Sequence, residues 1–466
     1  MCEQTPKFIP PKVWLALKIT AAALLALAIL ISAKVAITFC LGLFADGEHV
    51  VRLPGLGYPV VTLQELSKEE KKPQIPPDQL VELERVEIAV AGDVLLHMPI
   101  VTRSQALDGY NFDDIFLYAK PYLSSADYAV ANLETTFAGL DGNEYTGSTN
   151  FNSPDDFVFS AKTAGFDMLL TGNDHCFDYG TDGLKRTLKV LRSNGIASLG
   201  TVENITDPRH VITELGGIKV GMASYTFINS DENGKLSLNG NKVDTASAEH
   251  INTFDYSSLN RFYTQLEGEL AAMKAGGAEA TVLFLHWGDE YSTTVTSRQR
   301  EVAQKLCDLG VDVIVGSHPH VVQSLDLLTS RIDHNHSTIC MYSTGNFLSN
   351  LRSGSKTMKT GHCEDGVIFR FTLAKYNDES VRVASVKVIP TWVLVRGSGE
   401  VKDFYILPLD QTVTNWEKAY ALSEEQLSAA ESSYNRTMTL VTSGLNKIVN
   451  FIYDRSNPQD MTVGVG

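Results

Sequence analysis

The stretch Val86-Glu87-Ile88-Ala89-Val90-Ala91-Gly92-Asp93 decides the fold class of this chain. Its first six residues form a strand pattern, and a carboxylate follows directly at the end of the run. Further strand patterns occur at residues 127–131, 167–170, 280–285, 311–315, 339–342 and 367–373. Helical patterns lie between them, at residues 113–126, 154–165, 182–193, 256–274 and 297–309, and two apolar runs around Gly216-Gly217 indicate a hairpin. Strands that alternate with helices predict a layered α/β fold.

Side chains of the kind that bind metals follow five of these strands directly. They are Asp93, Glu134, the cluster Asn173-Asp174-His175, His286, and His318 with His320. Open α/β sheets bind ligands beyond the carboxyl ends of their strands, so we expect these side chains to share one site. Carboxylate, amide and imidazole groups can hold a pair of divalent ions, which activate water and stabilise the oxygens of a displacement. The mixed ligand set suits manganese, iron or zinc.

Each of these residues is a weak signal by itself, because a single Asp after a strand more often forms a turn. A lone histidine is likewise more often a core or surface residue than a ligand. We give that interpretation to the histidines outside the strand ends: His49, His210, His250, His334 and His336. The prediction of a site therefore rests on five strand ends that carry ligands together.

Composition limits the class of protein. The 466 residues suffice for one large domain or two, and the charged and apolar fractions are those of a globular protein. The formal net charge of −16 argues against a nucleic-acid-binding protein, since phosphate binding requires clustered Lys and Arg. The six cysteines form no Cys-x-x-Cys pair, which excludes a zinc ribbon or a thioredoxin-like motif and favours buried free thiols over disulfides.

An apolar segment near the N-terminus predicts a single transmembrane anchor. Residues 19–44 are apolar except for Lys34 and small hydroxyl side chains, and because of Lys34 a span over residues 13–33 is the alternative. Lysines precede the segment and acidic residues follow it, so the positive-inside rule places residues 1–18 in the cytoplasm and the main domain outside the cell. A cleaved signal peptide is the other interpretation, but the segment is long for one.

The rest of the chain divides by composition. Residues 45–85 are charged and contain Pro76-Pro77, which is typical of a stalk or linker. Residues 86–400 carry the alternating strands and helices. Residues 401–466 break that pattern, and residues 423–453 within them predict one or two helices that serve as packing support or as a peripheral extension.

The strand-end residues belong to longer blocks with a specific order. These are Gly92-Asp93, Asn132-Leu133-Glu134, Asn173-Asp174-His175 with Asp178-Tyr179-Gly180, His286-Trp287-Gly288-Asp289-Glu290-Tyr291, Gly316-Ser317-His318-Pro319-His320-Val321-Val322-Gln323 and Tyr342-Ser343-Thr344-Gly345-Asn346-Phe347. In these blocks, along about residues 86–395, the chain resembles the CapA family of capsule (poly-γ-glutamate) synthesis proteins. The resemblance implies a calcineurin-like metallophosphoesterase fold, which is a layered β-sandwich flanked by helices.

The resemblance also implies a ligand set for two divalent metal ions. Asp93 and Glu134 would be carboxylate ligands, with Glu134 bridging the two ions. His286, His318 and His320 would be imidazole ligands from later strand ends. In the third block the ligand is open, because relatives commonly have Asn-Asn-His where this chain has Asn173-Asp174-His175.

Four further residues receive roles from the resemblance. His175 would lie above the metals as a proton donor or a stabiliser of developing charge. Glu290 and Tyr291 would contact substrate, and a helix-start role is the alternative for Glu290. For Asn346, in a turn, a structural role and substrate contact are both open.

The first block departs from the usual pattern. Metallophosphoesterases typically have Asp-x-His there, whereas Asp93 is followed by Val94 and Leu95, and the nearest histidine is His97. If His97 is misplaced for the metal, one metal position is weak or vacant. The second block also has Glu134 where phosphoesterases usually have Asp.

Two functions are consistent with these features. The first is a metal-dependent hydrolase or transferase that acts on an anionic surface polymer or its precursor. The second is a non-catalytic subunit that binds or exports the polymer and contacts membrane-embedded capsule synthesis subunits. The anchor and the altered first block favour the second. Because the chain is acidic, binding a polyanion would need a metal or a local basic patch. The substrate bond is open, since phosphoester and amide hydrolysis can both use metal-activated water.

Overall fold

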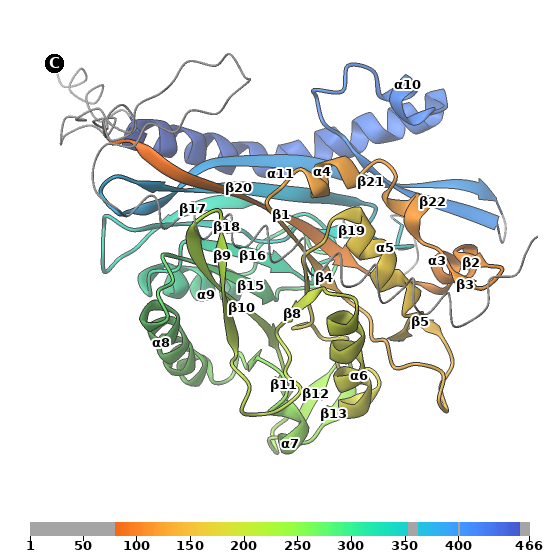
Figure 1. Cartoon of the computed structure of the whole chain (residues 1–466), viewed down its shortest axis with the longest axis horizontal. Coiled ribbons are helices and arrows are strands. Elements are labelled where there is room, and N and C mark those ends of the chain that lie inside the picture. Colours follow the sequence, from red (N-terminus) through yellow and green to blue (C-terminus); the bar gives the residue numbers. More distant parts are fainter. Residues whose placement is uncertain (1–79, 353–361, 399–400, 457–466) are drawn as a thin grey trace, which may run out of the picture. The chain divides into compact units, whose positions relative to one another are not determined.

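Strand β1 (Glu82–Val94) lies in the middle of the first of two large sheets (Figure 1). The structure is a computed structural model that describes residues 80–352, 362–398 and 401–456. The predicted anchor at residues 19–44 and most of the predicted stalk lie outside these ranges. Among the helices of the described residues, none is long and apolar enough to cross a membrane.

The first sheet has the strand order β22-β21-β20-β1-β4-β7-β8, and β19 also pairs with β1. Its other strands are β4 (Tyr128–Leu133), β7 (Met168–Leu170), β8 (Ala197–Leu199), β19 (Asn346–Leu348), β20 (Asp365–Tyr376), β21 (Val381–Ser398) and β22 (Val401–Pro408). Strands β1, β4, β7 and β8 are parallel, whereas β20, β21 and β22 are antiparallel to their neighbours. The parallel strands therefore place their carboxyl ends at one edge.

The second sheet has the order β14-β10-β15-β16-β18-β17, with β9 paired to β10. Its strands are β9 (His210–Leu215), β10 (Ile218–Phe227), β14 (Thr253–Phe254), β15 (Ala280–His286), β16 (Val313–Ser317), β17 (Leu325–Thr329) and β18 (Ser337–Met341). The turn at Gly216-Gly217 joins β9 to β10, which confirms the predicted hairpin. Strands β10, β15, β16 and β18 are parallel, so this sheet also gathers its carboxyl ends.

Helices and short strands complete the described residues. The helices are α3 (Met98–Arg103), η1 (Asp113–Phe116), α4 (Lys120–Ser124), α5 (Asp156–Ala164), α6 (Gly180–Ser193), α7 (Thr245–Ala248), α8 (Leu259–Ala275), α9 (Ser297–Asp308), α10 (Trp416–Tyr420) and α11 (Glu424–Ser456). The short strands are β2 (Gln105–Ala106), β3 (Gly109–Tyr110), β5 (Thr146–Ser148), β6 (Asn150–Asn152), β11 (Asn229–Ser230), β12 (Leu236–Leu238) and β13 (Asn241–Val243).

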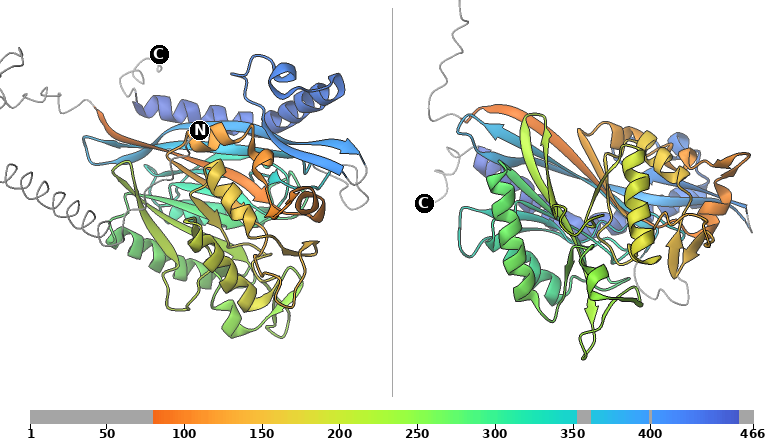
Figure 2. Two further views of the ribbon diagram at one scale, coloured as in Figure 1. Left: turned by 45° about the vertical axis from the view of Figure 1, so that its right-hand side comes forward. Right: turned by 60° about the horizontal axis from the view of Figure 1, so that its bottom comes forward.

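The alternation of side chains in β1 shows how the layers are stacked. Val86, Ile88 and Val90 point into the core between the two sheets, whereas Ala89 and Ala91 point into the core beneath α4 and α5. On the other side, α8 and α9 cover the outer face of the second sheet. Helix α11 lies on the opposite side from α8 and α9 (Figure 1 and Figure 2). The order helix–sheet–sheet–helix confirms the predicted layered α/β architecture.

Two predicted domain boundaries differ from the structure. The stalk was expected to reach residue 85, but Glu82 and Arg85 already pair with β20, because backbone hydrogen bonds do not require apolar side chains. The boundary at 400/401 separates two paired strands, since β22 continues the first sheet beside β21. Helix α11 then packs on β21 and is tied to β20, where Asp365 accepts hydrogen bonds from Ser433 and Arg436. The C-terminal residues are thus integral to the domain.

One predicted helix is broken, and the cysteines behave as expected. The pattern at residues 113–126 yields η1 and α4 separately. Pro121 explains the break, because proline lacks an N–H and its ring clashes with the carbonyl group four residues earlier. Four cysteines lie among the described residues, and Cys176, Cys307, Cys340 and Cys363 are all buried free thiols.

Candidate metal centre

The carboxyl ends of five strands bring the predicted ligands together. Strands β1, β4, β7, β15 and β16 end next to one another where the two sheets meet. Two groups of ligand atoms form there, each with its members within 4.8 Å of one another. The first cluster comprises Glu134, Asp174, His286 and His318; the second cluster comprises Asp93, Glu134 and His320.

The first cluster is centred on His286 Nε2. This atom lies 2.9 Å from Asp174 Oδ1, 3.3 Å from Glu134 Oε1 and 3.1 Å from His318 Nδ1. His318 Nδ1 in turn lies 3.8 Å from Asp174 Oδ2. Two imidazole nitrogens and two carboxylates therefore face one point, which is a ligand set of the kind that binds borderline divalent metals.

The second cluster uses the other oxygen of the same glutamate. His320 Nδ1 lies 3.6 Å from Asp93 Oδ2 and 3.6 Å from Glu134 Oε2. Glu134 thus offers Oε1 to the first cluster and Oε2 to the second. A carboxylate between two ligand groups is the arrangement expected of a bridge between two cations.

Burial and unsatisfied oxygens show that these residues fit a bound cation. Asp93, Glu134 and Asp174 are all buried. Among the described residues, Glu134 Oε2 and Asn173 Oδ1 are buried oxygens without a hydrogen-bond partner. Buried carboxylates are costly unless a positive charge or a metal compensates them. A divalent cation supplies that charge, so the donors present match the group that the fold class implies.

The electrostatics of the two carboxylates at the first cluster differ. Burial, and then the charges of Asp93 and Asp174, raise the pKa of Glu134 well above its ordinary value. Burial also opposes the charge of Asp174, but the neighbouring histidines, His175 foremost, hold the pKa of Asp174 well below its ordinary value. Close carboxylates that cannot all be charged without a cation are a feature of metal sites.

The backbone at the histidine pair is unusual. His318 has φ +94° and His320 has φ +56°, in the left-handed region that residues other than glycine rarely adopt. Pro319 lies between them, and its carbonyl group accepts a hydrogen bond of 2.8 Å from Tyr291 N. Backbone strain of this kind concentrates at functional sites, where it aims side chains that a regular strand could not. Here it turns two imidazoles toward the two clusters.

His175 lies beside the clusters with its orientation fixed. Its Nδ1 lies 2.8 Å from Asp178 Oδ2, and its ring packs edge-on against Phe151 at 4.8 Å. Asn239 Nδ2 donates to Asp178 Oδ1 at 3.0 Å. Although burial opposes a charge on His175, Asp174 and Asp178 raise the pKa of His175 to about 9. Asp174 and Asp178 thus favour the protonated form of the imidazole.

Two positioning residues were not predicted. Asn132 Nδ2 donates to Asp93 Oδ1 at 2.9 Å and to Glu134 Oε1 at 3.3 Å, so it holds the carboxylates of both clusters. Ser317 Oγ lies 3.0 Å from His286 Nδ1, which leaves Nε2 as the ligand atom. The spacing of Asn132 and Glu134 could have indicated that Asn132 lies at the site, because residues two apart on a strand point to the same face.

The two candidate ligands of the third block have different surroundings. Asp174 belongs to the first cluster through its carboxylate. Asn173 Nδ2 donates to Asn132 Oδ1 at 3.1 Å and to Leu133 O at 2.7 Å, which leaves Oδ1 as the unpaired atom. Asp174 thus lies among the ligand atoms of the first cluster, and Asn173 keeps one buried oxygen without a hydrogen-bond partner.

His97 is not part of either cluster. Its ring packs edge-on against Phe151 at 5.2 Å, its Nδ1 accepts a hydrogen bond from Asn350 N, and burial lowers the pKa of His97 to about 4. It directly precedes α3, and the four-residue spacing from Asp93 places it beyond the end of β1 at Val94. The expectation that His97 is misplaced for the metal agrees with this arrangement.

The predicted substrate contacts lie in different surroundings. Glu290 is exposed in a turn, and because α9 begins only at Ser297 it does not start a helix. Its charge raises the pKa of both Glu134 and His175, so it faces the site. Tyr291 is half-buried, with its ring 5.8 Å from that of His320. Asn346 is fully buried, at 0% exposure, which contradicts substrate contact.

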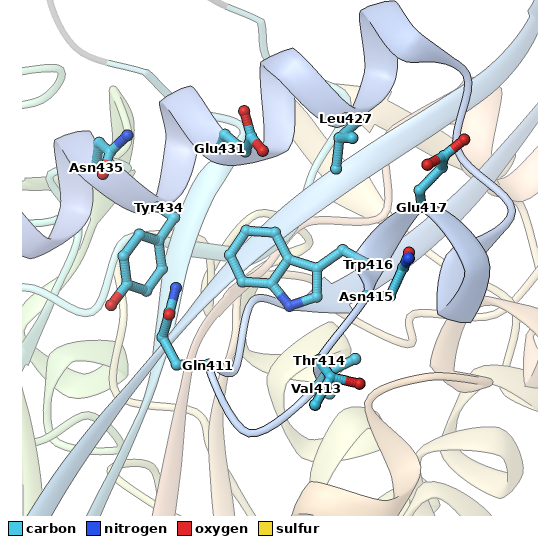
Figure 3. Close-up of a pocket in the computed structure, with 10 residues that line it drawn as sticks. All are labelled: Gln411, Val413, Thr414, Asn415, Trp416, Glu417, Leu427, Glu431, Tyr434 and Asn435. Carbon is cyan, nitrogen blue, oxygen red and sulfur yellow. The ribbon is translucent and has the colours of Figure 1, made fainter.

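A separate pocket lies away from these residues (Figure 3). It has a volume of about 410 Å³ and lies between α10, α11 and the loop before α10, with Trp416, Tyr434 and Glu431 among its lining residues. None of the predicted site residues lines it.

Comparisons with known proteins give consistent matches over this region. A family model described as bacterial capsule synthesis protein PGA_cap matches residues 87–351. The capsule biosynthesis protein CapA of Bacillus anthracis is 27% identical over 278 residues, which cover 57% of this chain and 60% of that protein. The PGA biosynthesis protein CapA of Bacillus subtilis (strain 168) is 25% identical over 248 residues, which cover 51% of this chain and 57% of that protein.

The chain spans about six tenths of the length of the curated relatives it matches. Among solved structures, the sulfate thiohydrolase SoxB of Thermus thermophilus matches 67% of this chain and 42% of its own at 14% identity. Its TM-score of 0.31 is too low to indicate a shared fold.

Proposed function

The chain belongs to the bacterial capsule synthesis protein family PGA_cap, and from this premise we propose that it is a metal-dependent hydrolase or transferase acting on an anionic capsule polymer or its precursor. The names of the two CapA relatives support the capsule as the context. The apolar segment at residues 19–44 is proposed to hold the domain on the outer side of the cell membrane.

The finer fold is proposed to be that of the metallophosphoesterases. Two sheets pack face to face, helices cover their outer faces, and the ligand residues follow the parallel strands of both sheets. In such α/β folds the site lies beyond the carboxyl ends of the strands. The family match over residues 87–351 covers all of the strands that carry these ligands.

One observation carries the proposal: two buried ligand clusters share Glu134. We propose that each cluster binds one divalent cation, of manganese, iron or zinc, with Asp174, His286 and His318 on one side and Asp93 and His320 on the other. A bound pair of cations supplies the positive charge that activates water and stabilises the attacking and leaving oxygens.

The protein's own side chains would orient that chemistry. Asn132 and Ser317 hold the ligands in place through hydrogen bonds to carboxylate and imidazole atoms. His175 has Nδ1 held by Asp178, so Nε2 is the atom from which it can pass a proton to a leaving group. Glu290, exposed at the site, is suited to a polar contact with substrate.

The acidity of the chain bears on how a polyanion would be recognised. With a net charge of −16, the protein repels an anionic polymer at long range. Binding then depends on local positive charge, which the two cations provide in the same place as the chemistry. A non-catalytic polymer-binding subunit would need the same cations but not the fixed His175, and this residue favours the enzyme.

Metal content and turnover test the proposal together. Purified full-length protein is loaded with manganese or zinc, and bound metal is measured by mass spectrometry beside hydrolysis of a generic phosphodiester and of a γ-glutamyl amide. Two ions per chain and turnover of one substrate are expected. The double variant His318→Ala with His320→Ala is expected to lose both by more than about 100-fold, since losing a supporting residue alone costs about 10–100-fold.

A matched control separates this loss from a general effect of removing histidine. His334 is exposed and lies in neither cluster, so His334→Ala is expected to retain metal and activity. Failure of the loaded wild-type protein to bind metal would refute the proposal. Metal binding in the wild type without turnover of either substrate class would instead support the polymer-binding subunit.

A further inference from the structure

Resting on the proposed metal function, we propose that Asn346 is a ligand of the second cluster through its side-chain oxygen Oδ1. The second cluster has three ligand residues, whereas the first has four. The first block lacks a histidine two residues after Asp93, and His97 belongs to neither cluster. Asn346, from the neighbouring strand β19, would supply a fourth ligand to this cluster.

The distances place the oxygen of Asn346 at the cluster. Asn346 Oδ1 lies 3.1 Å from His320 Nδ1. That nitrogen is the ring atom that faces both carboxylates, at 3.6 Å from Asp93 Oδ2 and 3.6 Å from Glu134 Oε2. Asn346 Oδ1 is therefore nearer to the imidazole ligand atom than either carboxylate is.

The amide has one possible orientation. The amide atom opposite the one that faces His320 lies 2.9 Å from the carbonyl oxygen of Cys363, which can only accept a hydrogen bond. The NH₂ group must therefore point at Cys363, because an amide oxygen there would face another acceptor. Oδ1 is left facing His320 and the second cluster.

The backbone holds Asn346 beside Asp93. The two residues are direct partners in the parallel pair of β1 and β19, and Asp93 N donates to Gly345 O at 2.9 Å. Directly paired residues of neighbouring strands point to the same face of a sheet. Both side chains are 0% exposed, so solvent does not compete for either oxygen.

The contact between Asn346 and His320 has the geometry of a hydrogen bond and is equally compatible with one cation held by both atoms. If Nδ1 of His320 carries a proton, it can donate to Oδ1, but it then cannot bind a metal. If Nδ1 binds a metal, its lone pair and that of Oδ1 face each other at 3.1 Å and repel. One cation held by both atoms removes the repulsion, and the second cluster then has four ligand residues, as four-coordinate metal sites require.

The number and affinity of bound ions test this assignment. Equilibrium dialysis of the full-length protein with Mn²⁺ is expected to give two ions for the wild type. Asn346→Leu, which has a similar size but no donor oxygen, is expected to bind one ion at wild-type affinity and the other at least about 10-fold more weakly. Asn346→Asp loses the hydrogen bond to Cys363 O but keeps an oxygen that faces the second cluster, and it is expected to bind two ions.

A spectroscopic readout separates a ligand from a residue that only supports His320. In the Co²⁺-loaded protein, Asn346→Asp changes the donor atom set and is expected to shift the visible absorption bands of one of the two sites. A residue that merely holds the imidazole in place would alter affinity but leave the bands at their wild-type wavelengths. Unchanged bands together with two ions would overturn the assignment.

The outcomes distinguish this inference from the proposed function. Wild-type protein that binds no ion overturns both. Wild-type protein that binds two ions, together with a folded Asn346→Leu that binds two with equal affinity, overturns the role of Asn346 alone. Circular dichroism of the metal-free variants establishes folding, and Asn346→Asp keeps the test decisive if the leucine variant does not fold.

Discussion

Replacing Gly92 with alanine is expected to separate β1 from β19 and to weaken the second cluster. Gly92 directly precedes Asp93, where the two strands come close together. A Cβ atom at Gly92 would lie 2.0 Å from Gly345 O and 2.9 Å from Gly345 C. Real Cβ atoms do not come within 3.0 Å of other heavy atoms, and these neighbours are backbone atoms that cannot rotate away.

The size of the effect follows from two losses. Forcing an extra carbon into a packed core costs about 1–3 kcal/mol, and moving Gly345 O away from Asp93 N forfeits a hydrogen bond worth about 0.5–1.5 kcal/mol. We therefore expect Gly92→Ala to lower the free energy of unfolding by about 1.5–4.5 kcal/mol, the sum of the two losses. Because Asp93 and Asn346 are partners across this junction, the displaced strands also weaken cation binding at the second cluster.

Urea unfolding of the metal-free protein, followed by circular dichroism, measures the change directly. A lower midpoint with an unchanged slope indicates a loss of stability rather than a change in the unfolded state. Gly268→Ala is the matched control, since Gly268 lies within α8 and nothing lies within 4 Å of its added Cβ atom. The same chemical change there is expected to stabilise the protein by about 0.5–1 kcal/mol, because alanine favours helix over glycine.

Gly92→Ala is expected to lower the free energy of unfolding, whereas Gly268→Ala is expected to raise it. If Gly92→Ala leaves the unfolding free energy within about 0.5 kcal/mol of the wild type, as surface substitutions do, the close approach of β1 and β19 is wrong. If it destabilises the protein but leaves both cations bound at wild-type affinity, the link from this junction to the second cluster is refuted.

Two further predictions concern α9 and the ion pair at its end. Thr296 and Gln299 form a capping box at the start of α9, so Thr296→Ala should lower the free energy of unfolding by about 1 kcal/mol. Ser297→Ala, at the exposed neighbouring position, is the control and should leave it unchanged. Equal urea midpoints for the two variants would contradict this role of the capping box. Burial disfavours the charge of Asp308, but hydrogen bonds from Arg331 hold the pKa of Asp308 below its ordinary value. This stabilisation is present above about pH 3.9 and is lost as the pH falls through the lower folded-state pKa. Asp308→Asn should therefore be less stable than the wild type at neutral pH, and the urea midpoints of the two proteins should converge in acid. A difference in midpoints that stays constant with pH would refute the stabilising role of the Asp308–Arg331 ion pair.

The location of the site could be predicted because its signals are local. In β1 the apolar residues alternate between two cores, and a carboxylate follows directly. Parallel strands bring their carboxyl ends to one edge, so the predicted metal ligands at five strand ends had to approach one another. The structure groups Asp93, Glu134, Asp174 and the three strand-end histidines accordingly.

In other parts of the fold the local sequence signal was weak or was outweighed by the residues around it. Strand β8 has only three residues, and β22 was assigned to an extension because its helical neighbours dominate the C-terminal pattern. Short and edge strands depend on the partner strand for their stability, so their sequences specify them weakly. The break between η1 and α4 was readable in Pro121 but was outweighed by the apolar pattern around it.

The amino-acid sequence alone was sufficient for the layered α/β class and for the side chains that gather at the strand ends, because periodicity and residue type act over a few neighbouring positions. Tertiary structure decided which atoms meet. It placed β19 beside β1, brought Asn346 next to Asp93, turned His318 and His320 into the left-handed region, and left His97 outside both clusters. These contacts join segments far apart in the chain, and their geometry depends on the packing of the two sheets rather than on any local preference.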